Sequence, residues 1–440
     1  LITARNGIIV GSGITLSKDG DGFFTGVVTA TSYAGDGSGL TGVAGTENIR
    51  TNTNATFLQN INVGVAITAG KLGIGFTDTN VKIGNTALDS LTTGTNNVGV
   101  GQEALTASTT GYRNTAVGVR AAKTITTGNS NVAIGYEALE FTTTGTQNVA
   151  IGHQALEANT TADSNVAIGN AAMVSNTTGT LNVAIGLQAL DANTTGSQSI
   201  AIGAQALGAQ NADVKNIAVG YRALQALTGG DGNIGVGRDV LYSLTTGDGN
   251  VAIGNDALGN NTTASNNTAV GKNALAANTT GTNNVAVGYQ ALDANTTASN
   301  NTAIGHGSLT SATTATENTA VGRASMTNTT TGGYNVAVGS GTLYTNVTGA
   351  NNVAVGRDAL LMNTASNNTA LGFHALTANT TGGNNAAVGT YALDANTTGA
   401  GNVALGYNAL GANTTANDNI AIGYEALKLN TTGTRNIAVG

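Results

Sequence analysis

Residues 284–300 read N-V-A-V-G-Y-Q-A-L-D-A-N-T-T-A-S-N, and residues 301–317 repeat this pattern as N-T-A-I-G-H-G-S-L-T-S-A-T-T-A-T-E. We call the glycine that closes each N-V-A-V-G-like segment the marker glycine. Marker glycines recur in steps of 17, with a single step of 16, at positions 84, 101, 118, 135, 152, 169, 186, 203, 220, 237, 254, 271, 288, 305, 322, 339, 356, 372, 389, 406, 423 and 440. A short period kept over so many copies is typical of a solenoid, in which each repeat stacks on the previous one.

Each position of the repeat admits few residue types, so the copies can be compared as columns. An Asn lies four residues before the marker glycine in every copy except one, which has Ser199. Val, Ile or Thr follows it in all copies but one, and Val, Ile or Leu always precedes the marker glycine. A Leu or Met lies four residues after the marker glycine, with Ala122 as the exception. In the two copies quoted above, the predicted ladder residues are Asn284, Val285, Ala286, Val287, Gly288, Leu292, Asn301, Ala303, Ile304, Gly305 and Leu309.

This repeat predicts an all-β fold, a parallel β-solenoid or β-roll from residue 79 to residue 440. An α-helical pair needs about twice as many residues as one copy offers, and Val, Ile and Thr favour pleated backbone. We therefore expect two short strands and two turns per coil, with identical columns stacked about 4.8 Å apart. The Asn column fits a stacked amide ladder.

The position two residues before the marker glycine is the most restricted one. After Lys82 in the first copy, it holds only Ala or, at Gly99 and Gly235, Gly. Neighbouring strand residues point to opposite faces, so Val and Ile lie on one face and Ala on the other. Because the Ala column admits no larger side chain, we expect both faces to be buried. One coil can cover only one of them, which predicts that another copy of the chain covers the second.

Composition excludes several classes of function. Only 9% of the 440 residues are charged and the net charge is −7, so no basic surface favours nucleic acid or an anionic membrane. The chain has no Cys, which excludes disulfides and a thiolate metal site. No apolar run is long enough to span a bilayer, so we expect no membrane insertion. The sequence indicates no cofactor.

Residues 1–78 do not follow the period and predict an irregular, β-rich N-terminal region, whose Asp-Gly pairs are interpreted as turns rather than calcium loops. The array from residue 79 onward has no linker. Because the chain starts without Met, we expect that it is processed or begins inside a longer chain. Because it ends on a marker glycine with no cap, we expect that a further domain follows or that this end docks on a partner.

The N-V-A-I-G core resembles the head repeats of trimeric autotransporter adhesins (YadA-like heads), although those repeats are usually shorter than the repeat of this chain. The unit N-T-A-V-G-x-x-A-L-x-x-N-T-T-G looks even more like repeats of phage tail-fibre proteins. Residues 28–43, V-T-A-T-S-Y-A-G-D-G-S-G-L-T-G-V, are similar to segments of marine cyanophage tail fibres. The resemblance implies a left-handed, homotrimeric rod located on a virion or at a cell surface. Its implied partners are the chain itself and a cell-surface glycan or protein receptor.

Aromatic residues often follow the marker glycine directly, and they are the candidate surface-contact residues: Tyr136, Tyr221, Tyr289, Tyr407 and Tyr424. A strip of aromatics could contact glycans. Their scatter along the chain instead favours an ordinary solvated edge.

No catalytic or metal-binding residue is predicted. The histidines, His153, His306 and His374, lie in separate coils, which argues against a metal cluster. Asp239 and Asp256 share a column one coil apart and could form a glycosidase pair, but a regular rod should offer no cleft. The Asn-Thr-Thr triplets match the glycosylation pattern, yet they are read more simply as turns.

Three functions therefore remain open. The favoured one is the shaft of a homotrimeric viral tail fibre involved in host attachment, without enzymatic activity. The alternative is a bacterial surface adhesin or extracellular filament subunit. The third is an ice-binding solenoid, although neighbouring threonines point to opposite faces and only one Thr column can face outward.

Overall fold

The computed structural model describes residues 14–16, 22–24, 79–212 and 214–440. The chain divides into two units, Leu1–Leu72 and Gly73–Gly440. In the first unit, β1 (Ile14–Leu16) and β2 (Gly22–Phe24) pair antiparallel. The remainder of the β-rich region predicted for residues 1–78 lies outside the described residues.

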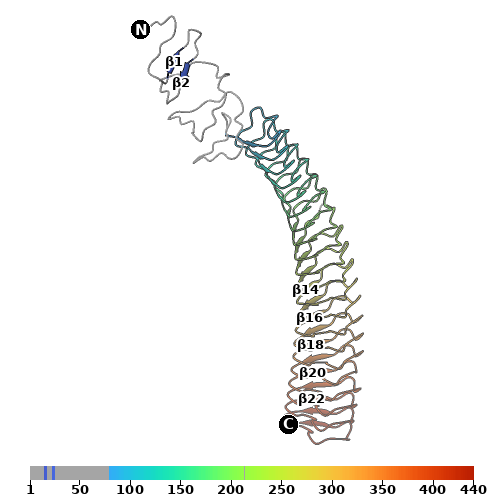
Figure 1. The fold of residues 1–440 in the computed structure, drawn as a ribbon. Coiled ribbons are helices and arrows are strands. Elements are labelled where there is room, and N and C mark those ends of the chain that lie inside the picture. The colour runs from blue at the N-terminus through green and yellow to red at the C-terminus, as the bar shows by residue number, and fades with distance from the viewer. Residues whose placement is uncertain (1–13, 17–21, 25–78, 213) are drawn as a thin grey trace. The chain divides into compact units, whose positions relative to one another are not determined.

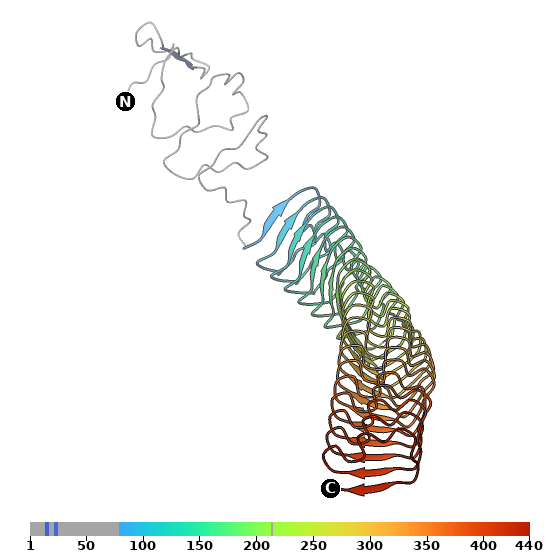
Figure 2. The ribbon, with the colours of Figure 1, turned by 90° about the horizontal axis from the view of Figure 1, so that it is seen from below.

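The second unit is a parallel β-solenoid of 17-residue coils, as predicted, in which the strands of successive coils lie side by side (Figures 1 and 2). Each coil contributes one three-residue strand, and each strand pairs in register with the next, as Ala286 does with Ala303. The strands are β3 (Val81–Ile83), β4 (Val98–Val100), β5 (Thr115–Val117), β6 (Val132–Ile134), β7 (Val149–Ile151), β8 (Val166–Ile168), β9 (Val183–Ile185), β10 (Ile200–Ile202), β11 (Ile217–Val219), β12 (Ile234–Val236), β13 (Val251–Ile253), β14 (Thr268–Val270), β15 (Val285–Val287), β16 (Thr302–Ile304), β17 (Thr319–Val321), β18 (Val336–Val338), β19 (Val353–Val355), β20 (Thr369–Leu371), β21 (Ala386–Val388), β22 (Val403–Leu405), β23 (Ile420–Ile422) and β24 (Ile437–Val439).

One strand per coil corrects the prediction of two. The rest of the coil cannot be pleated, because three of its positions take the left-handed backbone conformation. In the coil of Gly288 these residues are Gln290, Leu292 and Asn300, with φ of 54°, 55° and 63°. L-residues other than Gly rarely adopt this conformation, and it breaks the extended path of a strand. Hydrogen bonds between coils nevertheless continue through the turns, since Leu292 N donates to Ser308 O at 2.9 Å.

The core lies inside each coil and consists of small and medium side chains. Ala286 and Ala291 are fully buried, as is Leu292. A Cβ added at Gly235, which stands in the Ala column, would lie only 2.6 Å from Leu224 Cδ1. The Ala column therefore packs across the interior against the Leu column, and this contact explains why it admits nothing larger than a methyl group.

The marker glycine is required by its conformation and by the close approach of the next coil. Gly288 has a φ of +139°, and a Cβ there would lie 2.5 Å from the carbonyl oxygen of Gly305. Almost every other marker glycine meets the next one in the same way. Only glycine fits this column.

The predicted Asn ladder is present and buried. Asn284 Nδ2 donates to Ala298 O at 2.9 Å, and Asn284 Oδ1 accepts the backbone N–H of Asn301 at 3.0 Å. The side chain thus ties one turn to its own strand and to the next coil. Polar groups buried in this way need such partners.

A second internal Asn ladder, seven residues after the marker glycine, escaped the sequence analysis. Asn295 is fully buried, and its Nδ2 donates to Asn278 Oδ1 at 2.8 Å and to Ala298 O at 3.1 Å. This Asn begins the Asn-Thr-Thr triplet. Because its amide points into the coil, Asn295 is not accessible for glycosylation in the folded rod.

Candidate functional site

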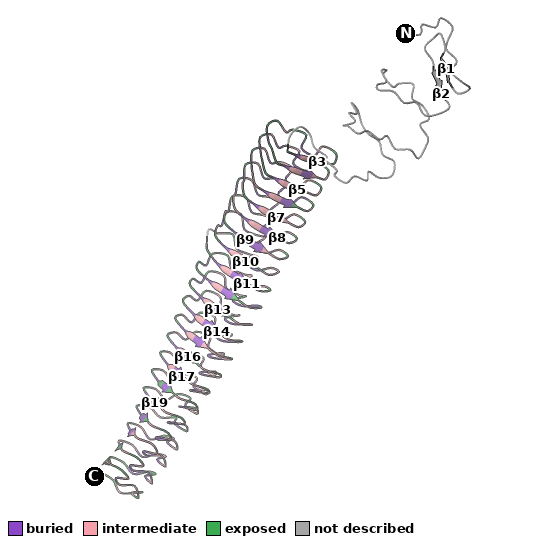
Figure 3. Ribbon diagram, turned by 90° about the vertical axis from the view of Figure 1, so that its left-hand side faces the viewer, coloured by how far each residue is buried: buried purple, intermediate pink, exposed green. Residues whose placement is uncertain are grey.

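The outward face of the strand sheet is apolar and only partly covered. Residues on either side of the buried Ala are less buried than the Ala itself, as in β15 and β16. In Figure 3 the strands accordingly carry purple for buried beside pink for intermediate. We call these side chains the outer sheet face. Its exposed large members are Ile83, Ile134, Ile202, Val236, Ile253, Ile304, Val336, Val338, Val353, Leu371, Val403, Leu405, Ile422, Ile437 and Val439.

This finding identifies which of the two strand faces the coil itself buries; the expectation that another copy covers the second face stays a prediction. The Ala face fills the interior of its own coil, whereas Val353 and Val403 are each 38% exposed in the single chain. The face that a second copy would have to cover is therefore the Val/Ile face.

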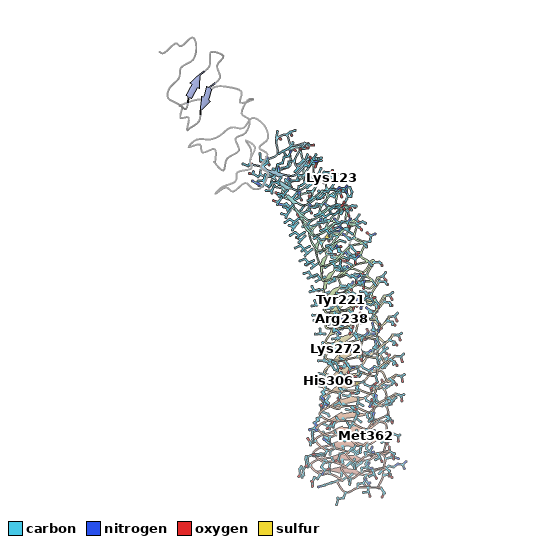
Figure 4. All side chains as sticks on the ribbon, in the orientation of Figure 1. Lys123, Tyr221, Arg238, Lys272, His306 and Met362 are labelled. Carbon is cyan, nitrogen blue, oxygen red and sulfur yellow. The ribbon has the colours of Figure 1, made fainter. Side chains whose placement is uncertain are left out.

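The five candidate surface-contact tyrosines all lie exposed, directly after a marker glycine. Tyr136 stacks on His153 and Tyr289 stacks on His306, each with ring centroids 5.3 Å apart across one coil. Figure 4 shows Tyr221, Arg238, Lys272 and His306 one below the other along the rod. Two of the three histidines thus belong to stacked ring pairs.

The C-terminal coils bring aromatic rings into one continuous cluster. Phe373 contacts Tyr391 with centroids 5.5 Å apart, Tyr391 contacts Tyr407 at 6.2 Å, and Tyr407 stacks on Tyr424 at 5.3 Å. His374 lies against both Phe373 and Tyr391. The argument that the aromatics are scattered is therefore wrong for these coils, since stacking makes neighbours of residues that lie about one period apart in sequence.

A charged network surrounds Arg120 near the start of the array. Arg120 Nη1 lies 2.8 Å from Glu137 Oε1, and Lys123 Nζ lies 2.7 Å from Glu103 Oε2. The hydrogen bond from Lys123 lowers the pKa of Glu103. Burial alone would raise the pKa of Glu137, but hydrogen bonds from Tyr136 and other neighbours, Arg120 among them, outweigh it and lower that pKa.

Three carboxylates in this network offer oxygens within 4.8 Å of one another: Glu137, Glu140 and Glu157. Oxygen ligands at this spacing suit a hard cation. The sequence analysis predicted no metal site and did not single out these residues, because they come from two coils. Arg120 already places positive charge beside them, at 2.8 Å from Glu137 and 4.0 Å from Glu140.

Carboxylates in the fifth position after the marker glycine share an unusual environment. Burial raises the pKa of each of them above its ordinary value, and backbone hydrogen bonds only partly offset this where they occur. We call them the fifth-position carboxylates: Glu140, Glu157, Asp191, Asp293 and Asp394.

Separate open cavities lie between the second and fifth positions after the marker glycine in several coils. The one beside Gly259, a fifth-position residue, has a volume of about 400 Å³, with Asp239 and Asp256 in its wall. The expectation that the rod offers no cleft is thus wrong here. Asp239 is held in two ion pairs, 2.7 Å from Arg222 Nη2 and 2.9 Å from Arg238 Nε. It is therefore engaged with guanidinium groups rather than free to act in a glycosidase pair.

The paired threonines differ in role. Oγ1 of the first one donates to the next coil, as from Thr279 to Thr296 O at 2.9 Å. The second one, such as Thr280 or Thr297, is exposed. One outward Thr column therefore exists, as the sequence analysis predicted.

Among the described residues, no helix could cross a membrane. No protein-family model matches the chain, and no curated protein shows significant sequence similarity to it.

Proposed function

We propose that the chain is the shaft of a homotrimeric viral tail fibre that serves host attachment. The observation that carries the proposal is the outer sheet face, which continues from β3 to β24 along the described array. The resemblance of the repeat to tail-fibre repeats supports the same role. A shaft needs length, stiffness and a way to bundle, and it needs no catalytic group.

The size of the outer sheet face supports self-association. Strands of three residues are about 10 Å long, and the 22 stacked strands extend over about 100 Å, so the face covers roughly 1,000 Å². Soluble monomers rarely expose apolar patches beyond a few hundred Å². Packing three copies face to face around one axis would cover it along the whole rod.

Light scattering on the purified chain tests this proposal. We expect a mass about three times 43.2 kDa, whereas the monomer mass would rule out the trimer and the fibre role with it. Replacing Val336, Val338 and Val353 by Lys should increase the monomer fraction. Val347→Lys is the matched control, because Val347 is 41% exposed but lies outside the strands.

The second candidate is a surface adhesin whose rod itself binds, and the aromatic cluster from Phe373 to Tyr424 favours it. Exposed aromatic side chains are enriched at binding surfaces. Replacing Phe373, Tyr407 and Tyr424 by Ser in the intact trimer distinguishes the two roles in a cell-adhesion assay. Loss of adhesion supports the adhesin, and unchanged adhesion supports a passive shaft.

A further inference from the structure

The cavity beside Gly259 is built by four successive coils. One wall is the second position after each marker glycine, and the other wall is mainly the fifth position. The lining residues are Arg222, Asp239 and Asp256 with Asn273 on the first wall, and Tyr242, Gly259 and Ala276 with Asn260 on the second. Because Gly259 lacks a side chain, about 400 Å³ stays open, which is within the range of small-molecule sites.

The charges in this cavity compensate one another. Arg222 and Arg238 both pair with Asp239. Asp256 Oδ2 accepts a hydrogen bond from Asn255 Nδ2 at 2.7 Å, and no cation pairs with it among the described residues. Arg238 does not line the cavity, but its ion pair with Asp239 adds a second guanidinium group beside it. Counted with Arg238, the two guanidinium groups balance the carboxylates of Asp239 and Asp256, so the site favours neither an anion nor a cation.

Unused hydrogen-bonding groups face the same space. The side-chain amides of Asn260 and Asn273 make no hydrogen bond to another described residue, and each can donate and accept. The Tyr242 ring is 37% exposed, with Arg222 Cζ 4.7 Å from its centroid. The cavity thus combines donors, acceptors and an aromatic edge within one small volume.

We propose that this cavity binds one neutral saccharide unit of a surface glycan. Sugar hydroxyls both donate and accept hydrogen bonds, which matches the Asn amides and the Asp256 carboxylate, while C–H groups of a sugar ring can pack on Tyr242. This inference rests on the proposed attachment function, to which it adds a ligand class and a place on the rod.

The site remains accessible when the outer sheet face is covered. Leu258 is fully buried and belongs to the Leu column, which packs across the coil against the Ala column of the strands. The wall that carries Gly259 therefore lies across the interior from the strand wall. A trimer that buries the strands leaves this wall in contact with solvent.

The test fills the cavity in the full-length chain. Gln occupies the fifth position naturally at Gln225, so Gly259→Gln should fold. A Cβ at Gly259 meets its nearest atom, Asp256 O, at 3.3 Å, which requires only a small shift. Gly208→Gln is the matched control, because Gly208 holds the same position in another coil. Its Cβ would meet Asp191 Oδ1 at 3.4 Å.

Saturation-transfer NMR would use glucose, galactose, mannose and N-acetylglucosamine as neutral probes, with glucuronate and glucosamine as charged ones. We expect at least one neutral sugar to bind the unaltered chain. Its affinity should be at least tenfold lower for Gly259→Gln and unchanged for Gly208→Gln. Asn260→Ala, a change at an exposed side chain, should weaken binding at least threefold and provides a second variant should Gly259→Gln misfold.

The proposal is overturned if no neutral probe binds, if only charged probes bind, or if binding survives both Gly259→Gln and Asn260→Ala. Light scattering on the same samples reports the trimer separately. A trimer without saccharide binding refutes this inference alone, whereas a monomer refutes the proposed function.

Discussion

Replacing Asn284 by Ala removes one rung of the first Asn ladder. The backbone N–H of Asn301 loses its acceptor, Asn284 Oδ1, and Asn301 is only 1% exposed, so water cannot replace it. Ala298 O keeps another donor, Asn295 Nδ2, at 3.1 Å. An orphaned buried N–H costs about 1–3 kcal/mol, and the single bond lost from Asn284 Nδ2 to Ala298 O adds about 0.5–1.5 kcal/mol, which makes the loss from these two groups about 1.5–4.5 kcal/mol.

The assay should be local, because long repeat arrays do not unfold in two states. Native-state hydrogen exchange of the β15 and β16 amides in the full chain should accelerate about tenfold to a thousandfold, since every 1.4 kcal/mol is about a factor of ten. Thr297→Ala, at an exposed position of the same coil, is the control and should leave exchange unchanged.

The chain itself provides a graded variant. At Ser199 the hydroxyl oxygen accepts the N–H of Asn216 at 3.3 Å, so a Ser can partly replace the Asn. Asn284→Ser should therefore accelerate exchange less than Asn284→Ala. Equal exchange in Asn284→Ala and in the Thr297 control would show that the ladder does not stabilise the rod through these hydrogen bonds.

Three further changes test other parts of the structure. Ala286→Leu with Ala303→Leu should cost about 1–3 kcal/mol each by overpacking the interior, and an unchanged melting temperature of the double variant would contradict the packing of the Ala column. Gly288→Ala places a Cβ 2.5 Å from Gly305 O at a φ of +139°, so hydrogen exchange should reveal local unfolding of both coils. Native-like protection in this variant would contradict the requirement for glycine at the marker position. The fifth-position carboxylates hold their protons to higher pH in the folded than in the unfolded chain, so folded rods bind more protons just above the ordinary pKa values of Asp and Glu, 3.8 and 4.5. The stability of the rod, measured by thermal melting, should therefore rise as pH falls from 7 towards about 4.5. Changing the three Asp members to Asn should flatten this rise. An equal rise in this variant would refute the assignment of the pH dependence to these carboxylates.

The repeat period was enough to predict the solenoid and its register. Residues of one column, such as Asn284 and Asn301 or Gly288 and Gly305, are one period apart in sequence. Stacking in register places each residue beside its counterpart in the next coil, so every coil makes the same contacts. The Ala column was correctly recognised as sterically restricted. Which face it occupies could not be predicted, because alternation places Ala and Val on opposite faces without identifying the interior.

Tertiary structure decided three other features. Leu292 has no residue-type signal for its left-handed backbone. In this conformation its side chain is buried in the interior and its backbone N–H reaches Ser308 O of the next coil. Asn295 looked like a turn residue and proved to be a buried ladder amide. Its role depends on where the turn carbonyls lie.

Contacts between coils are the last feature that the one-dimensional pattern hid. Tyr407 and Tyr424 are one period apart in sequence but only 5.3 Å apart as rings, and the wall beside Gly259 draws residues from four coils. Local sequence determined what each coil looks like, since the strand, the marker glycine and the Ala–Leu contact repeat within one period. The surface of the rod depends on side chains that differ from coil to coil and meet only through stacking, so only the assembled structure shows where a partner can bind.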